Sequence, residues 1–206
     1  LEHESIKLAE RVQKATLDIR DRERETLMRL AKAGEYRDEE TGNHVVRMAR
    51  YSALIAERLG SSSAEIDAIE RAAPLHDIGK IGIPDQILLK PGKFLPEEWE
   101  VMKTHAVIGY EILKGSNSKF MKMGAEIALS HHEKWDGSGY PSGLSGDSIP
   151  LTGRIVCVAD VYDALTSRRP YKSPWSSEQA FEYLAEHAGE QFDPQIIDVF
   201  RSLRSR

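Results

Sequence analysis

The sequence has little cysteine, no long apolar run and no excess of positive charge. Cys157 is the only cysteine among 206 residues, so an internal disulfide framework is excluded and a reducing, cytoplasmic location is expected. No apolar run approaches the roughly 18 residues that a membrane-spanning helix needs. The formal net charge of -5 argues against non-specific binding to duplex nucleic acid. A phosphorylated ligand is still possible, because a few cations or metals can focus positive potential in a cleft.

The N-terminal end has neither an initiator methionine nor a signal-peptide pattern, and the first residue is Leu1. We therefore expect a segment of a longer protein, with a sensor or receiver domain upstream. A membrane anchor in that upstream part is an open alternative.

Apolar residues recur with helical spacing between loops, and no alternating strand pattern stands out. The fold class predicted is all-α. We divide the chain into a linker helix at 1–34 and a domain at 35–206. The expected helices cover 5–33, 38–59, 62–76, 96–113, 119–132 and 151–167, with two more beginning at Ser176 and Asp193.

The first predicted helix is rich in charged residues and carries one apolar face. Its spacing is roughly heptad and is interrupted at 21–25. It suits a signalling helix that pairs with a second copy, or a linker helix that packs on its own domain. Its apolar residues are Leu8, Val12, Ala15, Ile19, Leu27 and Leu30.

Five of the seven histidines lie at helix ends or beside carboxylates. Glu40 and His44 share one helix face, although a surface pair would explain them taken alone. Asp160 lies in an apolar helix, where a carboxylate is costly unless it is paired or ligated. Together these residues predict two or three divalent metals, and the lone cysteine excludes a thiolate site. The candidate donors are Glu40, His44, His76, Asp77, His105, His131, His132 and Asp160.

Two motifs resemble those of a known family. His76-Asp77 resembles the dipeptide of the HD superfamily of metal-dependent phosphohydrolases. The run 131–141, His-His-Glu-Lys-Trp-Asp-Gly-Ser-Gly-Tyr-Pro, resembles the extended motif of the HD-GYP subfamily. Further matches follow at 143–146, 149–150, 154–155, 159–166 and 169–172, so the resemblance covers roughly 35–200.

The resemblance implies an HD-type helical bundle around a bi- or trinuclear centre of iron, or alternatively manganese. It makes the candidate donors metal ligands, with Asp77 as the bridge, and it makes Glu40 with His44 the additional pair of a trinuclear site. Lys80 would stabilise charge near the scissile phosphate. The resemblance places Tyr140 beside the substrate, or alternatively at a partner surface. It places Arg169 and Lys172 on the substrate's phosphates, although solvated surface charge would also explain that pair.

The implied activity is hydrolysis of cyclic di-GMP by a metal-bridging hydroxide, giving linear pGpG and, after a second cut, GMP. Asp77 and Lys80 are the expected catalytic residues. One alternative is a slow cyclic di-GMP sensor or interaction module, with a diguanylate cyclase as partner. Another is an HD phosphohydrolase of a different nucleotide.

Overall fold

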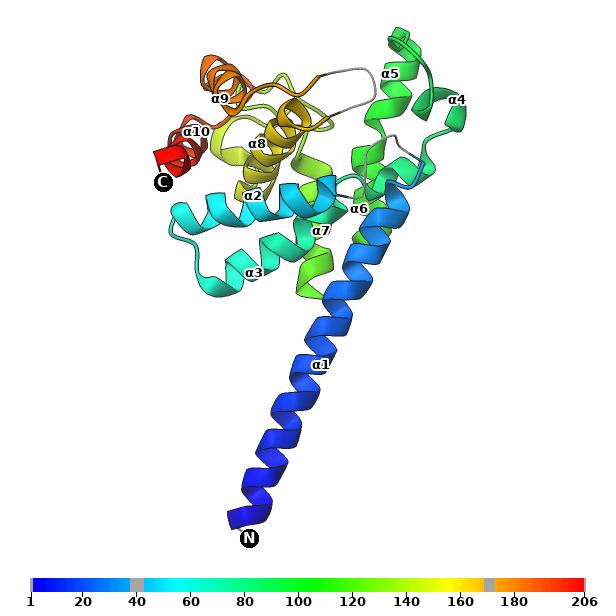
Figure 1. Cartoon of the computed structure of the whole chain (residues 1–206). Coiled ribbons are helices and arrows are strands. Elements are labelled where there is room, and N and C mark those ends of the chain that lie inside the picture. The colour runs from blue at the N-terminus through cyan, green and yellow to red at the C-terminus, as the bar shows by residue number, and fades with distance from the viewer. Residues whose placement is uncertain (1, 38–42, 169–172, 206) are drawn as a thin grey trace.

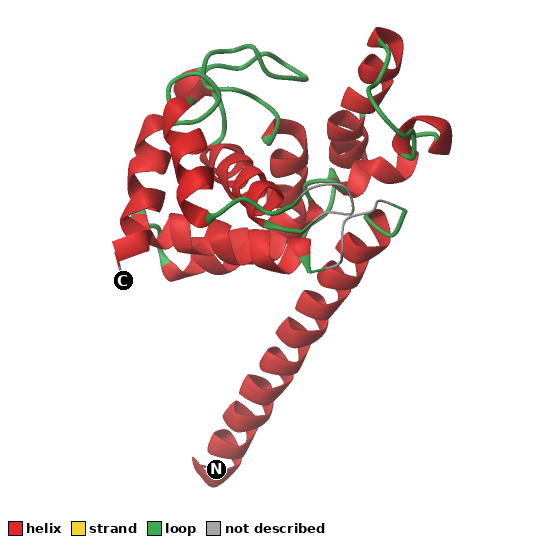
Figure 2. Cartoon of the chain, turned by 45° about the horizontal axis from the view of Figure 1, so that its top comes forward, coloured by secondary structure: helices red, strands yellow, loops and turns green. Residues whose placement is uncertain are grey.

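The computed structural model describes residues 2–37, 43–168 and 173–205. Within these ranges every regular element is a helix, and one isolated β-bridge joins Ala188 to Phe192 (Figures 1 and 2). The all-α prediction is therefore confirmed. The α-helices are α1 (Glu2–Gly34), α2 (His44–Arg58), α3 (Ser63–Ala72), α4 (Asp85–Leu88), α5 (Pro96–Lys103), α6 (His105–Leu113), α7 (Lys119–Ser130), α8 (Leu151–Thr166), α9 (Ser177–Glu186) and α10 (Pro194–Arg201). The 3₁₀ helices are η1 (Ala73–Leu75), η2 (Ile78–Gly82), η3 (Gly146–Ser148) and η4 (Ser202–Ser205).

Helix α1 projects away from the helical body for most of its length (Figure 1). Leu8, Val12 and Ile19 are exposed, whereas Leu27 and Ala31 are buried in a cluster with residues of η1, η2 and α7. The last turns of α1 thus pack on the domain. This is the behaviour expected of the linker alternative, and pairing with a second copy stays a prediction.

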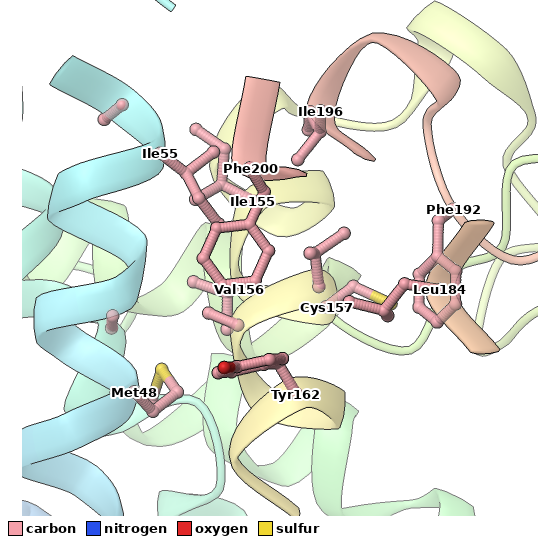
Figure 3. Packing of buried hydrophobic residues seen from close by; sticks show 14 of the residues in the cluster. Met48, Ile55, Ile155, Val156, Cys157, Tyr162, Leu184, Phe192, Ile196 and Phe200 are labelled. Carbon is pink, nitrogen blue, oxygen red and sulfur yellow. The ribbon is translucent and has the colours of Figure 1, made fainter. Parts of the chain in front are cut away.

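The main hydrophobic core lies among α2, α8, α9 and α10 (Figure 3). Met48 and Ile55 of α2 meet Tyr162 of α8 and Phe200 of α10 in this cluster. Cys157 is buried there as a free thiol, and burial raises its pKa to about 12. This core holds α2 against α8, and both helices carry candidate metal donors.

The predicted starts of three helices carry caps. Ser62 and Glu65 form a capping box before α3, and Ser176 and Gln179 form one before α9. The Asp193 side chain accepts a hydrogen bond from the backbone N–H of Gln195 at the start of α10. No helix in the described ranges is long and apolar enough to cross a bilayer.

Two predicted helices are shorter than expected. The segment 96–113 forms α5 and α6 rather than one helix, because Thr104 makes a tight turn in which its N–H and its hydroxyl both donate to the carbonyl of Val101. The segment 62–76 leaves the α-helix at Ala72 and continues as η1, where Pro74 has no N–H to donate. For the helix expected from residue 38, residues 38–42 lie outside the described ranges, and α2 begins at His44.

Candidate metal centre

The five candidate histidines form one continuous cluster, although they come from four parts of the chain. His44 begins α2, His76 follows η1, His105 begins α6, and His131 with His132 follows α7. The ring centroids are 5.8 Å apart for His44 and His76, 5.1 Å for His76 and His131, and 4.9 Å for His105 and His132. The tertiary structure therefore brings these predicted donors together.

Backbone carbonyls orient three of these imidazoles. The Nδ1 atoms of His76, His105 and His131 lie 3.1, 2.8 and 3.1 Å from the carbonyl oxygens of Ala73, Met102 and Ile127. If each Nδ1 donates to its carbonyl, each Nε2 keeps a lone pair. Metal-binding histidines are commonly oriented in this way.

Asp77 lies at the centre of the cluster and is buried. Its Oδ1 is 3.2 Å from His105 Nε2 and 3.5 Å from His131 Nε2, and its Oδ2 is 2.8 Å from Lys80 Nζ. Burial alone would raise the pKa of Asp77, but Lys80 and His76 hold it well below its usual range. The carboxylate is therefore ionised and available to a cation.

Several of these buried donor atoms make no hydrogen bond with any residue that the structure describes. They are Nε2 of His76, His105 and His131, together with Oδ1 of Asp77. Unsatisfied buried polar atoms are rare, and donor atoms of this kind that lie close together suit a cation. Donor atoms of Asp77, His105, His131 and His132 all lie within 4.8 Å of one another. Burial also lowers the pKa of His131 and His132, which keeps both imidazoles neutral, the form that binds metal.

A second group of possible ligands lies beside the first. Donor atoms of Glu35, His44 and His76 are within 4.8 Å of one another. Glu35 is 3% exposed, and among the described residues neither of its carboxylate oxygens has a hydrogen-bond partner. Burial raises the pKa of Glu35 to about 7, although His76 and His44 act in the opposite direction. Glu40, which the sequence pairs with His44, lies outside the described residues.

Two aspartates of α8 hold His44 in this second group. Asp160 Oδ1 is 3.4 Å from His44 Nε2, so this predicted ligand reaches the cluster. Asp163 is buried, and its Oδ2 lies 2.7 Å from His44 Nδ1, while Arg47 donates to both of its oxygens. Asp163 therefore orients His44 from the side away from the donors, a role that the sequence reasoning did not assign.

The loop after α7 places an aromatic ring against the cluster. Tyr140 stacks on His132 with ring centroids 4.7 Å apart. Buried Glu133 accepts hydrogen bonds from the backbone N–H groups of Ser142 and Leu144 and so holds the loop. Gly139 packs so closely on this turn that a Cβ would lie 2.3 Å from the nitrogen of Lys134. Tyr140 is thus beside the donors, and its contact with the substrate stays a prediction.

The other two predicted substrate-binding residues, Arg169 and Lys172, lie outside the described residues. Of the residues that sequence reasoning missed, Asp163 had a signal, because it is a second carboxylate three positions after Asp160 in an apolar helix. Glu35 had none, since it follows a helix in which acidic residues are frequent.

Known proteins are similar to this chain in sequence. The family model described as HD domain matches residues 25–196. The cyclic di-GMP phosphodiesterase response regulator RpfG of Xanthomonas campestris is 52% identical over 202 residues, covering 98% of this chain and 53% of the relative. A cyclic di-GMP phosphodiesterase of Thermotoga maritima is 52% identical over 179 residues, covering 87% of this chain and 49% of the relative. A 3'3'-cGAMP-specific phosphodiesterase 2 of Vibrio cholerae is 48% identical over 183 residues, covering 89% of this chain and 35% of the relative.

Solved structures agree in fold. The crystal structure of a cyclic GMP-AMP-specific phosphodiesterase of V. cholerae has a TM-score of 0.68 at 21% identity, covering 89% of this chain and 49% of that chain. The chain spans about half the length of the first two of these curated relatives. With its His-Asp dipeptide at the centre of a buried donor cluster and a family model matching most of its length, the chain belongs to the HD domain family.

Proposed function

We propose that this chain is the catalytic part of a metal-dependent phosphodiesterase that hydrolyses cyclic di-GMP to linear pGpG, with GMP as the product of a second cut. The observation that carries the proposal is that buried, unsatisfied imidazole and carboxylate atoms gather in two adjacent groups. The names of relatives that are 52% identical support the substrate. The carbonyl-oriented rings and ionised Asp77 support catalysis over a binding-only module.

We assign two metal positions. Asp77, His105, His131 and His132 would hold one metal. Glu35, His44, His76 and Asp160 would hold the other, and Glu40 paired with His44 stays the predicted additional pair for a third. The all-nitrogen-and-oxygen donor set suits iron, our first choice, or manganese. When bound, these metals would lower the pKa of water and neutralise negative charge on phosphoryl oxygens.

Lys80 and the loop residues act on the substrate. The Lys80 ammonium, 2.8 Å from Asp77 Oδ2, lies beside the donor cluster and can stabilise charge on the departing oxygen. Tyr140 closes one side of the cluster through its stacking on His132. Arg169 and Lys172 stay predicted phosphate contacts.

The wider context is also part of the proposal. We place the 1–34 segment as a linker that joins an upstream sensor or receiver domain to the 35–206 domain, with its exposed apolar residues pairing with a second copy. A diguanylate cyclase is the proposed signalling partner. The lone, buried thiol suits a reducing cytoplasm.

The test is hydrolysis by protein purified without oxygen and loaded with ferrous iron or manganese. We expect cleavage of cyclic di-GMP to pGpG that is lost on chelation and lost in Asp77→Ala, whereas Asp198→Asn, at an exposed site on α10, retains it. Parallel assays with 3'3'-cGAMP and single nucleotides test the substrate. Full turnover by a folded, metal-free Asp77→Ala protein would contradict the metal assignment, and faster turnover of another nucleotide would contradict the substrate.

A further inference from the structure

Trp99 lies close to the candidate metal centre, although it belongs to neither group of donors. Trp99 of α5 is 42% exposed, although it is one of the largest apolar side chains in the protein. Its ring centroid is 5.8 Å from that of Tyr140, with the planes at 84°. Since Tyr140 itself stacks on His132, a single tyrosine ring separates Trp99 from a candidate metal ligand.

The surroundings hold this indole in place while leaving part of it open. Phe94 lies nearly parallel to Trp99, with ring centroids 6.1 Å apart and an interplanar angle of 21°. Phe94 in turn packs against the small cluster of Ile83, Ile87 and Met102, which anchors α4 and α5. One helical turn beyond Trp99, Lys103 places its ammonium 6.0 Å from the centroid of the Tyr140 ring. Exposed aromatic surface next to a cationic group is typical of sites that stack nucleobases.

A metal centre binds the phosphodiester group, which every cyclic dinucleotide contains. Discrimination among such substrates must therefore come from contacts with the bases. Each base is joined through one ribose to the phosphodiester backbone, so a base-binding surface has to lie close to the donor cluster. Trp99 and Tyr140 together form an aromatic surface in that position.

We propose that Trp99 stacks on a purine base of the bound cyclic dinucleotide, with Tyr140 forming the adjoining wall of the same base site. This inference rests on the proposed function and adds a residue that selects purine-containing substrates. Because stacking of this kind is formed in the ground state as well as during reaction, its loss raises KM and leaves kcat nearly unchanged.

The test compares Trp99→Ala and Trp99→Phe with Leu151→Ala, a control at another apolar residue that is also 42% exposed. Two substrates are used: cyclic di-GMP, and a dialkyl phosphate diester, which has the phosphodiester but no aromatic ring. We expect Trp99→Ala to raise KM for cyclic di-GMP about tenfold, Trp99→Phe to restore most of it, and neither to change hydrolysis of the dialkyl diester. Leu151→Ala should match the wild type.

Each outcome separates this inference from the proposed function. An unchanged KM for cyclic di-GMP in Trp99→Ala overturns the base site while the wild-type enzyme still supports the proposed activity. An equal loss with both substrates also overturns it, because Trp99 would then only support Tyr140. If the wild type hydrolyses neither diester, equilibrium dialysis with cyclic di-GMP decides the matter. Weaker binding by Trp99→Ala than by the wild type supports the base site, and equal or absent binding overturns it.

Discussion

The groups that contact the imidazole Nδ1 atoms determine which nitrogen of each ring points into the donor cluster. Backbone carbonyls orient His76, His105 and His131, whereas a carboxylate, Asp163, orients His44. A carboxylate partner also increases the basicity of the imidazole it contacts. Asp163 should therefore matter for metal binding although it is not itself in either group of donors.

Replacing Asp163 with Asn should weaken metal binding at the group that contains His44 by roughly 10- to 100-fold, since the amide supports His44 less well than the carboxylate does. Metal affinity is measured by competition with a chelator. Asp198→Asn, on the exposed side of α10, is the control and should bind like the wild type. Unchanged affinity in Asp163→Asn would show that the contact with His44 has no such effect.

The Glu35 carboxylate should destabilise the metal-free protein above neutral pH, although it should help to hold metal when metal is present. Its pKa is raised from 4.5 to about 7, so the metal-free fold is most stable with Glu35 protonated and loses that contribution as the pH rises through 7. Glu35→Gln should therefore stabilise chelated protein at pH 8 by about 3 kcal/mol and have little effect near pH 4.5. With metal present, the same change should reduce bound metal.

Urea denaturation of chelated protein at both pH values measures this difference. Glu182→Gln, at an exposed position on α9, serves as the control and should change neither curve. An equal effect of Glu35→Gln at the two pH values would refute a raised pKa, and unchanged metal content would remove Glu35 from the proposed ligands.

At the scale of elements, the short helix η2 brings the His-Asp segment against α6. Gly79 makes this contact possible, because a Cβ there would lie 1.9 Å from the carbonyl oxygen of His105 and 2.4 Å from the nitrogen of Gly109. Arg37, just after α1, also donates to the carbonyl groups of Lys80 and Ile81. The position of η2 thus determines where Asp77 and Lys80 lie.

Gly79→Ala should destabilise the protein by about 3 kcal/mol or more and lower its metal content, since backbone has to move on both sides of the contact. Gly82→Ala in the same helix is the matched control. A Cβ at residue 82 would lie 3.0 Å from the side chain of Ile108, which can adjust more easily than backbone. Thermal unfolding and metal analysis compare the two variants, and equal effects would contradict a specific role for the close approach.

At the scale of the whole molecule, α1 belongs to the domain only in its last turns. Residues 3–22 are exposed, and burial of large apolar side chains begins at Leu27. The family match begins at residue 25, close to the same place. The projecting part of α1 therefore contributes little to the stability of the domain.

Removing residues 1–19 should leave the unfolding transition of the domain nearly unchanged, whereas Leu27→Ala should cost about 2–5 kcal/mol because it opens a cavity in a packed cluster. Denaturation measures both effects. Sedimentation of the two lengths also tests pairing of α1, which predicts a dimer only for the longer chain. A large loss of stability on truncation would contradict the conclusion that the projecting part of α1 contributes little to the stability of the domain.

Much of the architecture was predictable because its determinants are local. Helical spacing and the capping boxes at Ser62 and Ser176 depend on residues a few positions apart. The end of the α-helix at Ala72 and the break at Thr104 were missed, since helical spacing alone does not show where a tight turn replaces an α-helical hydrogen bond. The site was predicted in part, because histidine and aspartate stand out in apolar surroundings.

Residue type, helical spacing and the His-Asp and Gly-Tyr-Pro motifs are properties of short segments, so they predict the fold class, the chemistry of the donors and the family. Which of these residues meet depends on the tertiary structure. Asp163 contacts His44, which lies 119 positions earlier in the chain, and the C-terminal end of α1 brings Glu35 into the same cluster. Such contacts depend on how helices pack against one another, and helix packing is set by the whole core rather than by any one segment.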